Sequence, residues 1–146
     1  LGILVGVATI SVAAPVSAED AVDVTVTLST KGNDVSFDQT SLQVPFGATV
    51  KLKFKNAASK KSGIEHNVAI LKPGTEEHFL KLMSDPSYEM EKIEHSEDIL
   101  AKTQVLGPGK TDVITFKAPA KGYYTYICLV PGHGSMLGMK GILSVR

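Results

Sequence analysis

The residues best suited to chemistry lie in one short segment near the C-terminal end of the chain. Cys128, the only cysteine, opens a segment of sequence CLVPGH that ends at His133. Met136 and Met139 follow this segment, and His66 lies far upstream. Together these residues can supply one thiolate, two imidazoles and one thioether. Proteins use this set of donors to bind copper for one-electron transfer.

Other uses of a lone cysteine fit less well. It cannot form an intramolecular disulfide, and a structural zinc site takes four strong ligands, usually several of them thiolates. Thiolate and thioether favour Cu(I), while imidazole suits both oxidation states. We therefore expect one type 1 copper site, with most of its ligands on a tight loop that rearranges little when the metal changes its charge.

The elements that must position these ligands are predicted to be β-strands. Apolar and polar residues alternate along much of the chain, as in Val50, Leu52 and Phe54 against Lys51 and Lys53, which is typical of antiparallel strands with one buried face. Seven to eight short strands separated by Gly and Pro predict an all-β Greek-key sandwich. The strands are expected over residues 22–28, 42–44, 50–54, 67–71, 103–106, 113–116, 124–127 and 141–145.

One segment departs from this alternation. Residues 75–83 carry Phe79, Leu82 and Met83 at positions i, i+3 and i+4, with acidic residues in the first turn. This pattern predicts a short helix, with Thr75 placed to cap it. Residues 85–98 are charged and contain Pro86, so we expect irregular structure there.

Length and hydropathy divide the chain into two parts. Residues 1–16 carry no charge and are mostly apolar, and small residues at 16–18 precede Glu19. The run is shorter than the ~20 residues of a membrane span and predicts a signal peptide over 1–18, or else a membrane-anchor remnant. Residues 19–146 are then one domain, located in the periplasm or otherwise outside the cytoplasm.

Charge and motifs exclude several classes of function. The formal net charge is zero and no basic run is present, so nucleic acid is not an expected partner. The chain lacks a phosphate-binding loop, a nucleophile elbow and a metal-hydrolase motif, and we predict that it is not an enzyme. His78 and His95 lie in the helical and charged segments and are assigned no metal.

Several motifs together resemble the azurin- and auracyanin-type cupredoxins, over essentially all of residues 19–146. The matching stretches are HN at 66–67, LGPGKTDVITF at 106–116, YYTYICLVPGH at 123–133 and GMKGIL at 138–143. The resemblance implies a periplasmic or cell-surface electron carrier with copper bound by His66, Cys128, His133 and a methionine. It also implies that Asn67 forms a hydrogen bond with the Cys128 loop.

The axial methionine departs from the family pattern. Members usually carry it four or five residues after the loop histidine, whereas Met136 is three and Met139 six residues beyond His133. Met139 is favoured because its neighbours, Gly138 and the Lys-Gly pair at 140–141, reproduce the family's flanking residues. Met136 is the alternative. The Glu65 carbonyl could offer a weak axial contact on the opposite side, and its carboxylate is a less favoured ligand.

Two functions remain open at this stage. The first is a monomeric electron shuttle that meets redox proteins, such as cytochromes or respiratory or photosynthetic complexes, and that is anchored through its N-terminus if residues 1–18 are retained. Electrons would pass through the edge of His133, within a surface patch formed by Val130, Pro131, Gly132, Gly134, Met136 and Leu137. The second is a copper chaperone that delivers copper to an oxidase, which the additional methionine would suit.

Overall fold

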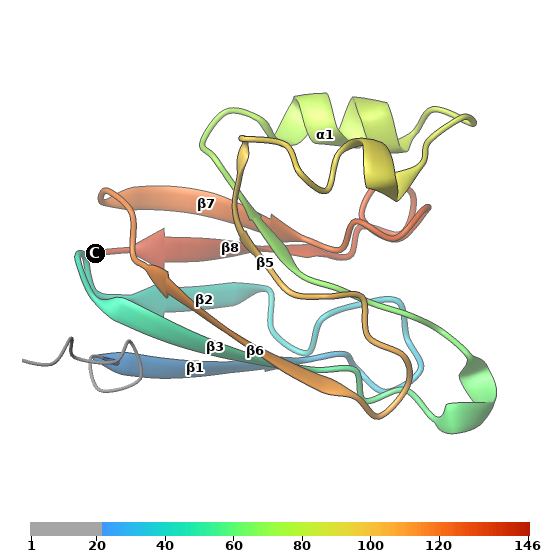
Figure 1. Cartoon of the computed structure of the whole chain (residues 1–146), viewed down its shortest axis with the longest axis horizontal. Helices are drawn as coiled ribbons and strands as arrows, with labels where there is room; N and C mark the ends of the chain where they lie inside the picture. The colour runs from blue at the N-terminus through green and yellow to red at the C-terminus, as the bar shows by residue number, and fades with distance from the viewer. Residues whose placement is uncertain (1–21) are drawn as a thin grey trace, which may run out of the picture.

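Two β-sheets packed face to face make up residues 22–146, the part of the chain that the computed structural model describes (Figure 1). The smaller sheet has the strand order β1-β3-β6 and the larger has β2-β8-β7-β4-β5. The all-β sandwich with a short helical insert is therefore confirmed. The signal or anchor segment predicted over 1–18 lies outside the described residues. The strands are β1 (Val24–Ser29), β2 (Ser41–Val44), β3 (Thr49–Lys55), β4 (Ala69–Leu71), β5 (Ile99–Lys102), β6 (Thr111–Lys117), β7 (Gly122–Ile127) and β8 (Lys140–Val145).

The strand directions differ in part from the antiparallel arrangement predicted. Strand β1 pairs with β3 in parallel, and β2 pairs with β8 in parallel. The pairs β3–β6, β4–β5, β4–β7 and β7–β8 are antiparallel. An alternating pattern defines which face of a strand is buried but carries no information on the direction of its neighbour, so the two parallel pairs could not be predicted from it.

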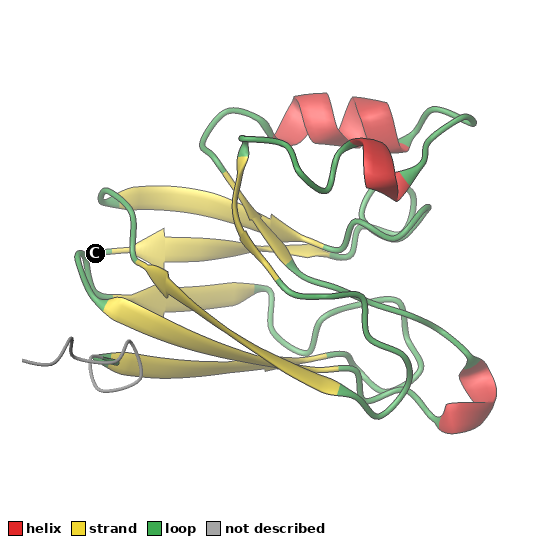
Figure 2. Cartoon of the chain, in the orientation of Figure 1, coloured by secondary structure: helices red, strands yellow, loops and turns green. Residues whose placement is uncertain are grey.

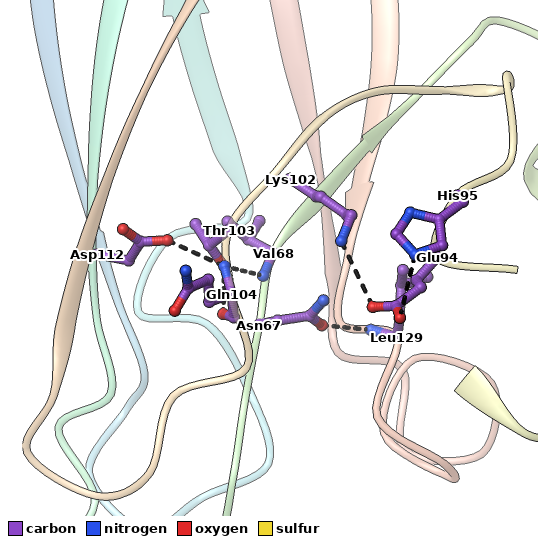
Figure 3. Close-up of polar contacts among 9 residues, drawn as sticks. All are labelled: Asn67, Val68, Glu94, His95, Lys102, Thr103, Gln104, Asp112 and Leu129. Carbon is purple, nitrogen blue, oxygen red and sulfur yellow. Dashed lines mark hydrogen bonds and ion pairs between the residues drawn. The ribbon is translucent and has the colours of Figure 1, made fainter. Parts of the chain in front are cut away.

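The prediction of a strand over residues 103–106 is wrong. Strand β5 ends at Lys102, and Leu106 forms only an isolated bridge with His66. Between them the Thr103 hydroxyl accepts a 3.1 Å hydrogen bond from the Val68 amide and donates one of 2.9 Å to the Gln104 carbonyl (Figure 3). A threonine side chain that bonds nearby backbone in this way competes with regular strand pairing.

The predicted helix is present as α1 (Glu76–Met83), and it buries Phe79 and Met83. Leu82, expected on the same face, is instead exposed. Thr75 does not cap the helix, because its hydroxyl donates to the Lys72 carbonyl at 2.8 Å. Elsewhere in residues 22–146, the helical structure is limited to the short 3₁₀ turns η2 (Lys60–Ser62) and η3 (Met90–Lys92) (Figure 2).

Among the described residues, the apolar interior forms two clusters. The main core fills the space between the sheets and includes Phe54 and Tyr126, whose rings each meet Phe37 edge-on. A Cβ added to Gly141 would lie 2.2 Å from the Tyr126 ring, so this position requires glycine. The second cluster lies beneath α1 and contains Ala69, Leu71, Phe79, Met83, Ile93, Ile127 and Leu129. Within residues 22–146, no helix has the length and apolar character needed to cross a membrane.

Candidate metal centre

The loop between β7 and β8 is closed by backbone hydrogen bonds that continue the strand pairing. The Cys128 amide donates to the Met139 carbonyl at 3.1 Å, and the Met139 amide donates to the His133 carbonyl at 3.0 Å. These two bonds bring the beginning, the middle and the end of the loop together. The thiol, the loop imidazole and the thioether of Met139 are thus carried by one closed backbone unit.

Two glycines permit the sharp turn within this loop. Gly132 has a φ of +81°, which side chains rarely adopt, and its carbonyl accepts the amides of Met136 and Leu137. A Cβ added to Gly134 would lie 2.7 Å from the Cys128 carbonyl oxygen and 2.5 Å from Cγ1 of Ile127. Glycine is therefore needed at 132 for its backbone conformation and at 134 for close packing.

Three ligand atoms converge at the end of the sandwich. The Cys128 Sγ lies 3.6 Å from Nδ1 of His133 and 4.0 Å from Nδ1 of His66. The ligand atoms of the three residues all lie within 4.8 Å of one another, close enough to share one metal ion. Met139 has no exposed surface and belongs to the same core cluster as Cys128.

His66 reaches the site from the segment just before β4. Its amide and carbonyl pair with those of Leu106, at 3.1 Å and 2.8 Å, so its backbone is fixed on both polar groups. Its ring and that of His133 have centroids 4.8 Å apart. His66 and Cys128 are fully buried, while His133 is partly exposed.

Burial controls the protonation of all three groups. It raises the pKa of the Cys128 thiol to about 11. It also lowers the pKa of His66 to about 4, with a further contribution from His133, and lowers the pKa of His133. At neutral pH both imidazoles are therefore unprotonated, the form in which they bind a metal, and the thiol must release its proton when it does so.

The residues fit a copper ion by two further criteria. Soft thiolate and thioether donors beside two imidazoles form a set that copper binds in both of its oxidation states. Nε2 of His66 is the one buried side-chain nitrogen or oxygen atom without a hydrogen-bond partner among residues 22–146. Nδ1 of the same ring lies 4.0 Å from the Cys128 sulfur, so it is the nitrogen placed to bind a metal beside the thiolate.

Hydrogen bonds from outside the loop fix the residue after the cysteine. Oδ1 of Asn67 accepts the Leu129 amide at 2.8 Å, which confirms the role expected of Asn67 (Figure 3). The Tyr88 hydroxyl donates to the Leu129 carbonyl at 2.6 Å. The hydrogen bond between Tyr88 and Leu129 was not predicted from the sequence. Tyr88 lies in a segment expected to be irregular, and no local pattern relates it to a residue 41 positions away.

Several other residues considered in the sequence analysis have exposed side chains. Met136 is 81% exposed, and Glu65, His78 and His95 are also exposed. The carboxylate of Glu65 is not part of the convergent group. Within the predicted surface patch, Gly134 is buried, because it packs against Ile127, and its inclusion in the patch was wrong. The exposed apolar side chains beside His133 are those of Pro131, Met136 and Leu137.

A two-sheet sandwich with a Cys-His-His cluster where β7 ends and β8 begins defines the cupredoxin class. A family model described as copper binding proteins of the plastocyanin/azurin family matches residues 24–146, and the chain belongs to this family. Auracyanin-A of Chloroflexus aurantiacus is 35% identical over 127 residues, covering 84% of this chain and 75% of the relative. Auracyanin-B of the same organism is 32% identical over 131 residues, covering 83% of this chain and 52% of the relative.

Solved structures agree with this assignment. The sodium-dithionite-reduced auracyanin from the photosynthetic bacterium Roseiflexus castenholzii superimposes with a TM-score of 0.69 at 30% identity, covering 86% of this chain and 98% of that one. Auracyanin A, described as a "blue" copper protein of Chloroflexus aurantiacus, gives a TM-score of 0.66 at 33% identity, and the match covers 84% of this chain and 98% of that one.

Proposed function

We propose that this protein is a blue-copper electron carrier in which His66, Cys128, His133 and Met139 bind a single copper ion. The observation that carries the proposal is the convergence of the Cys128 sulfur and the two histidine Nδ1 atoms at the end of the sandwich. Copper bound there would supply a one-electron Cu(I)/Cu(II) couple. The related auracyanins, one a "blue" copper protein and one obtained in a reduced form, support the same chemistry for this chain.

The protein's own residues would hold the donors still and exclude water. The side chains of His66, Cys128 and Met139 are buried, and backbone hydrogen bonds close the loop that carries two of them. Donors fixed in this way need little rearrangement when the charge of the site changes, and positioning of this kind is the main contribution a protein makes to a metal centre.

His133 offers the route to a partner because it alone of the three clustered ligands is partly exposed. The neighbouring Pro131, Met136 and Leu137 give this end of the molecule an apolar surface, and such surfaces commonly mark protein contacts. We propose that redox proteins such as cytochromes dock here through a small, transient interface. Copper delivery to an oxidase is not favoured, since the buried donors suit retention of the metal and Met136 lies out on the surface.

Location and processing follow as part of the same proposal. Residues 1–18 would direct export and residues 19–146 would form the copper-binding domain, working outside the cytoplasm as a monomer. Expression of the precursor with its export signal, followed by mass spectrometry of the protein in the periplasmic fraction, tests this. A mature N-terminus at Glu19 is expected, and a chain that keeps residues 1–18 in the membrane fraction would indicate an anchor instead.

The visible absorption spectrum of the copper-loaded protein tests the central proposal. Cu(II) bound to a thiolate in a trigonal site gives an intense band towards the red end of the spectrum, which should disappear on reduction and return on reoxidation. A loaded protein without this band, or one that does not cycle, would contradict an electron-transfer function.

A further inference from the structure

The insert, residues 72–98 between β4 and β5, lies across the loop that joins β7 to β8 (Figure 1). Side-chain contacts connect the two segments near the beginning, the middle and the end of the loop. They are the hydrogen bond from Tyr88 to the Leu129 carbonyl at 2.6 Å, the hydrogen bond from Ser135 to the Met83 carbonyl at 3.3 Å, and the ion pair of Lys140 with Glu76.

Packing reinforces these contacts on both sides of the cysteine. The side chain of Cys128 belongs to the main core, whereas those of Ile127 and Leu129 belong to the cluster beneath α1. Both neighbours have no exposed surface and pack with Phe79 and Met83 of the insert. The insert therefore holds the two residues that flank the thiol, while the thiol itself faces the other ligands.

The backbone of Leu129 is fixed at both of its polar groups. Its amide is bound by Asn67, from the segment that carries His66, and its carbonyl is bound by Tyr88, from the insert. Without the Tyr88 hydroxyl, the Leu129 carbonyl would lose this donor in a part-buried position, and an unsatisfied polar group favours local opening.

We propose that the insert braces the ligand loop and that Tyr88 is a positioning residue, which holds Cys128 in its metal-binding place whether or not a metal is bound. The inference rests on the proposed function because it assumes that Cys128 is a metal ligand. A loop kept in place by the protein, rather than by the metal, has less to rearrange between oxidation states and between the empty and loaded forms.

The test uses the metal-free protein and the variant Tyr88→Phe, which removes one hydroxyl and keeps the ring. An aromatic disulfide reagent can label Cys128 only when the loop opens locally. The loss of one hydrogen bond of ordinary strength should make the open state about tenfold more populated, so the labelling rate should rise about tenfold. Hydrogen exchange of the Leu129 amide should accelerate similarly. The matched control is Tyr123→Phe, since the Tyr123 ring is 69% exposed on β7, and it should leave both rates unchanged.

Exchange at the Phe54 amide in β3 separates local from global effects. If Tyr88→Phe raises the Phe54 and Leu129 rates equally, or leaves labelling of Cys128 unchanged, the brace is contradicted. In the copper-loaded variant we expect the visible band to remain and electron self-exchange to slow. A parent protein that gives no intense band with copper would contradict the proposed function, whereas the labelling and exchange experiments would still decide whether the insert holds the loop.

Discussion

The amide of Cys128 donates a 3.1 Å hydrogen bond to the carbonyl of Met139, so the two residues lie side by side although ten others separate them in the chain. Met139 is fully buried in the core cluster that contains Cys128. The amide of Met136 bonds instead to the Gly132 carbonyl, and its side chain is 81% exposed. The two methionines thus occupy very different places relative to the thiol.

Replacement of each methionine by leucine should separate their roles. Met139→Leu should retain copper and colour but raise the reduction potential by about 59 mV or more, a tenfold change for a one-electron couple. The reason is that the loss of an axial donor atom destabilises the doubly charged Cu(II) more than the singly charged Cu(I). Met136→Leu should leave the potential close to that of the parent. Voltammetry of both variants decides the point, and a large shift in the Met136 variant alone would reverse the assignment.

Substitution of the cysteine should remove the blue site. In Cys128→Ser a hydroxyl replaces the thiol, and it is too weak an acid and too hard a ligand to replace the thiolate on copper. We expect the Cu(II)-loaded variant to lack the intense visible band while its free energy of unfolding falls by no more than about 2 kcal/mol. An intense band that persists in the serine variant would show that Cys128 is not the ligand.

A positive charge beside His133 should disturb docking without disturbing the metal. Met136→Lys alters an exposed side chain, so the absorption spectrum should be almost unchanged while electron self-exchange slows about tenfold through like-charge repulsion across the contact. Stopped-flow or NMR line-broadening measurements give the rate. Tyr123→Lys is the control, since this exposed side chain lies at the start of β7. Equal rates in parent and Met136→Lys would place the docking surface elsewhere.

The stability of the metal-free protein should depend on pH in a specific way. Burial lowers the pKa of His66 from 6.5 to about 4, so below pH 6.5 the unfolded chain binds a proton that the folded protein does not. The stability that His66 contributes is therefore fully present above pH 6.5. As the pH falls towards 4, the free energy of unfolding decreases by up to about 3 kcal/mol. Burial raises the pKa of Cys128 from 9.0 to about 11, so its contribution is present below pH 9 and is lost as the pH rises towards 11.

Denaturant titrations of the metal-free protein between pH 4 and 11 measure this profile. The free energy of unfolding should be highest between about pH 7 and pH 9, as far as these two groups determine it. His66→Gln should flatten the acid limb, and Cys128→Ser should flatten the alkaline limb. If both limbs remain unchanged in these variants, other groups control the pH dependence.

A methyl group at Gly134 should strain the ligand loop. Because the new Cβ would lie 2.7 Å from the Cys128 carbonyl oxygen, Gly134→Ala should lower the free energy of unfolding by about 1–3 kcal/mol, as overpacking does, and should change the visible spectrum of the copper-loaded protein. Gly107→Ala is the matched control, since a Cβ there meets no atom within 4 Å. An unchanged spectrum and an unchanged stability in the Gly134→Ala variant would show that the backbone there yields easily.

Much of the site could be predicted from the chain alone because its chemistry is concentrated in a short segment. Cys128, His133 and Met139 lie within twelve positions, and the types and spacing of these residues leave copper as the best match. The sandwich could also be predicted, since burying one face of each strand requires alternation, as in β3, where Val50, Leu52 and Phe54 are buried.

Some features of the protein were determined only by the tertiary structure, because they depend on contacts between residues distant in sequence. The parallel pairing of β1 with β3 follows from how the chain crosses between sheets, which an alternating pattern does not encode. The same holds for Tyr88, whose hydrogen bond to Leu129 exists only because the insert folds back over the loop. Local spacing determines which donors a metal can find, whereas packing of the whole chain determines what holds those donors in place.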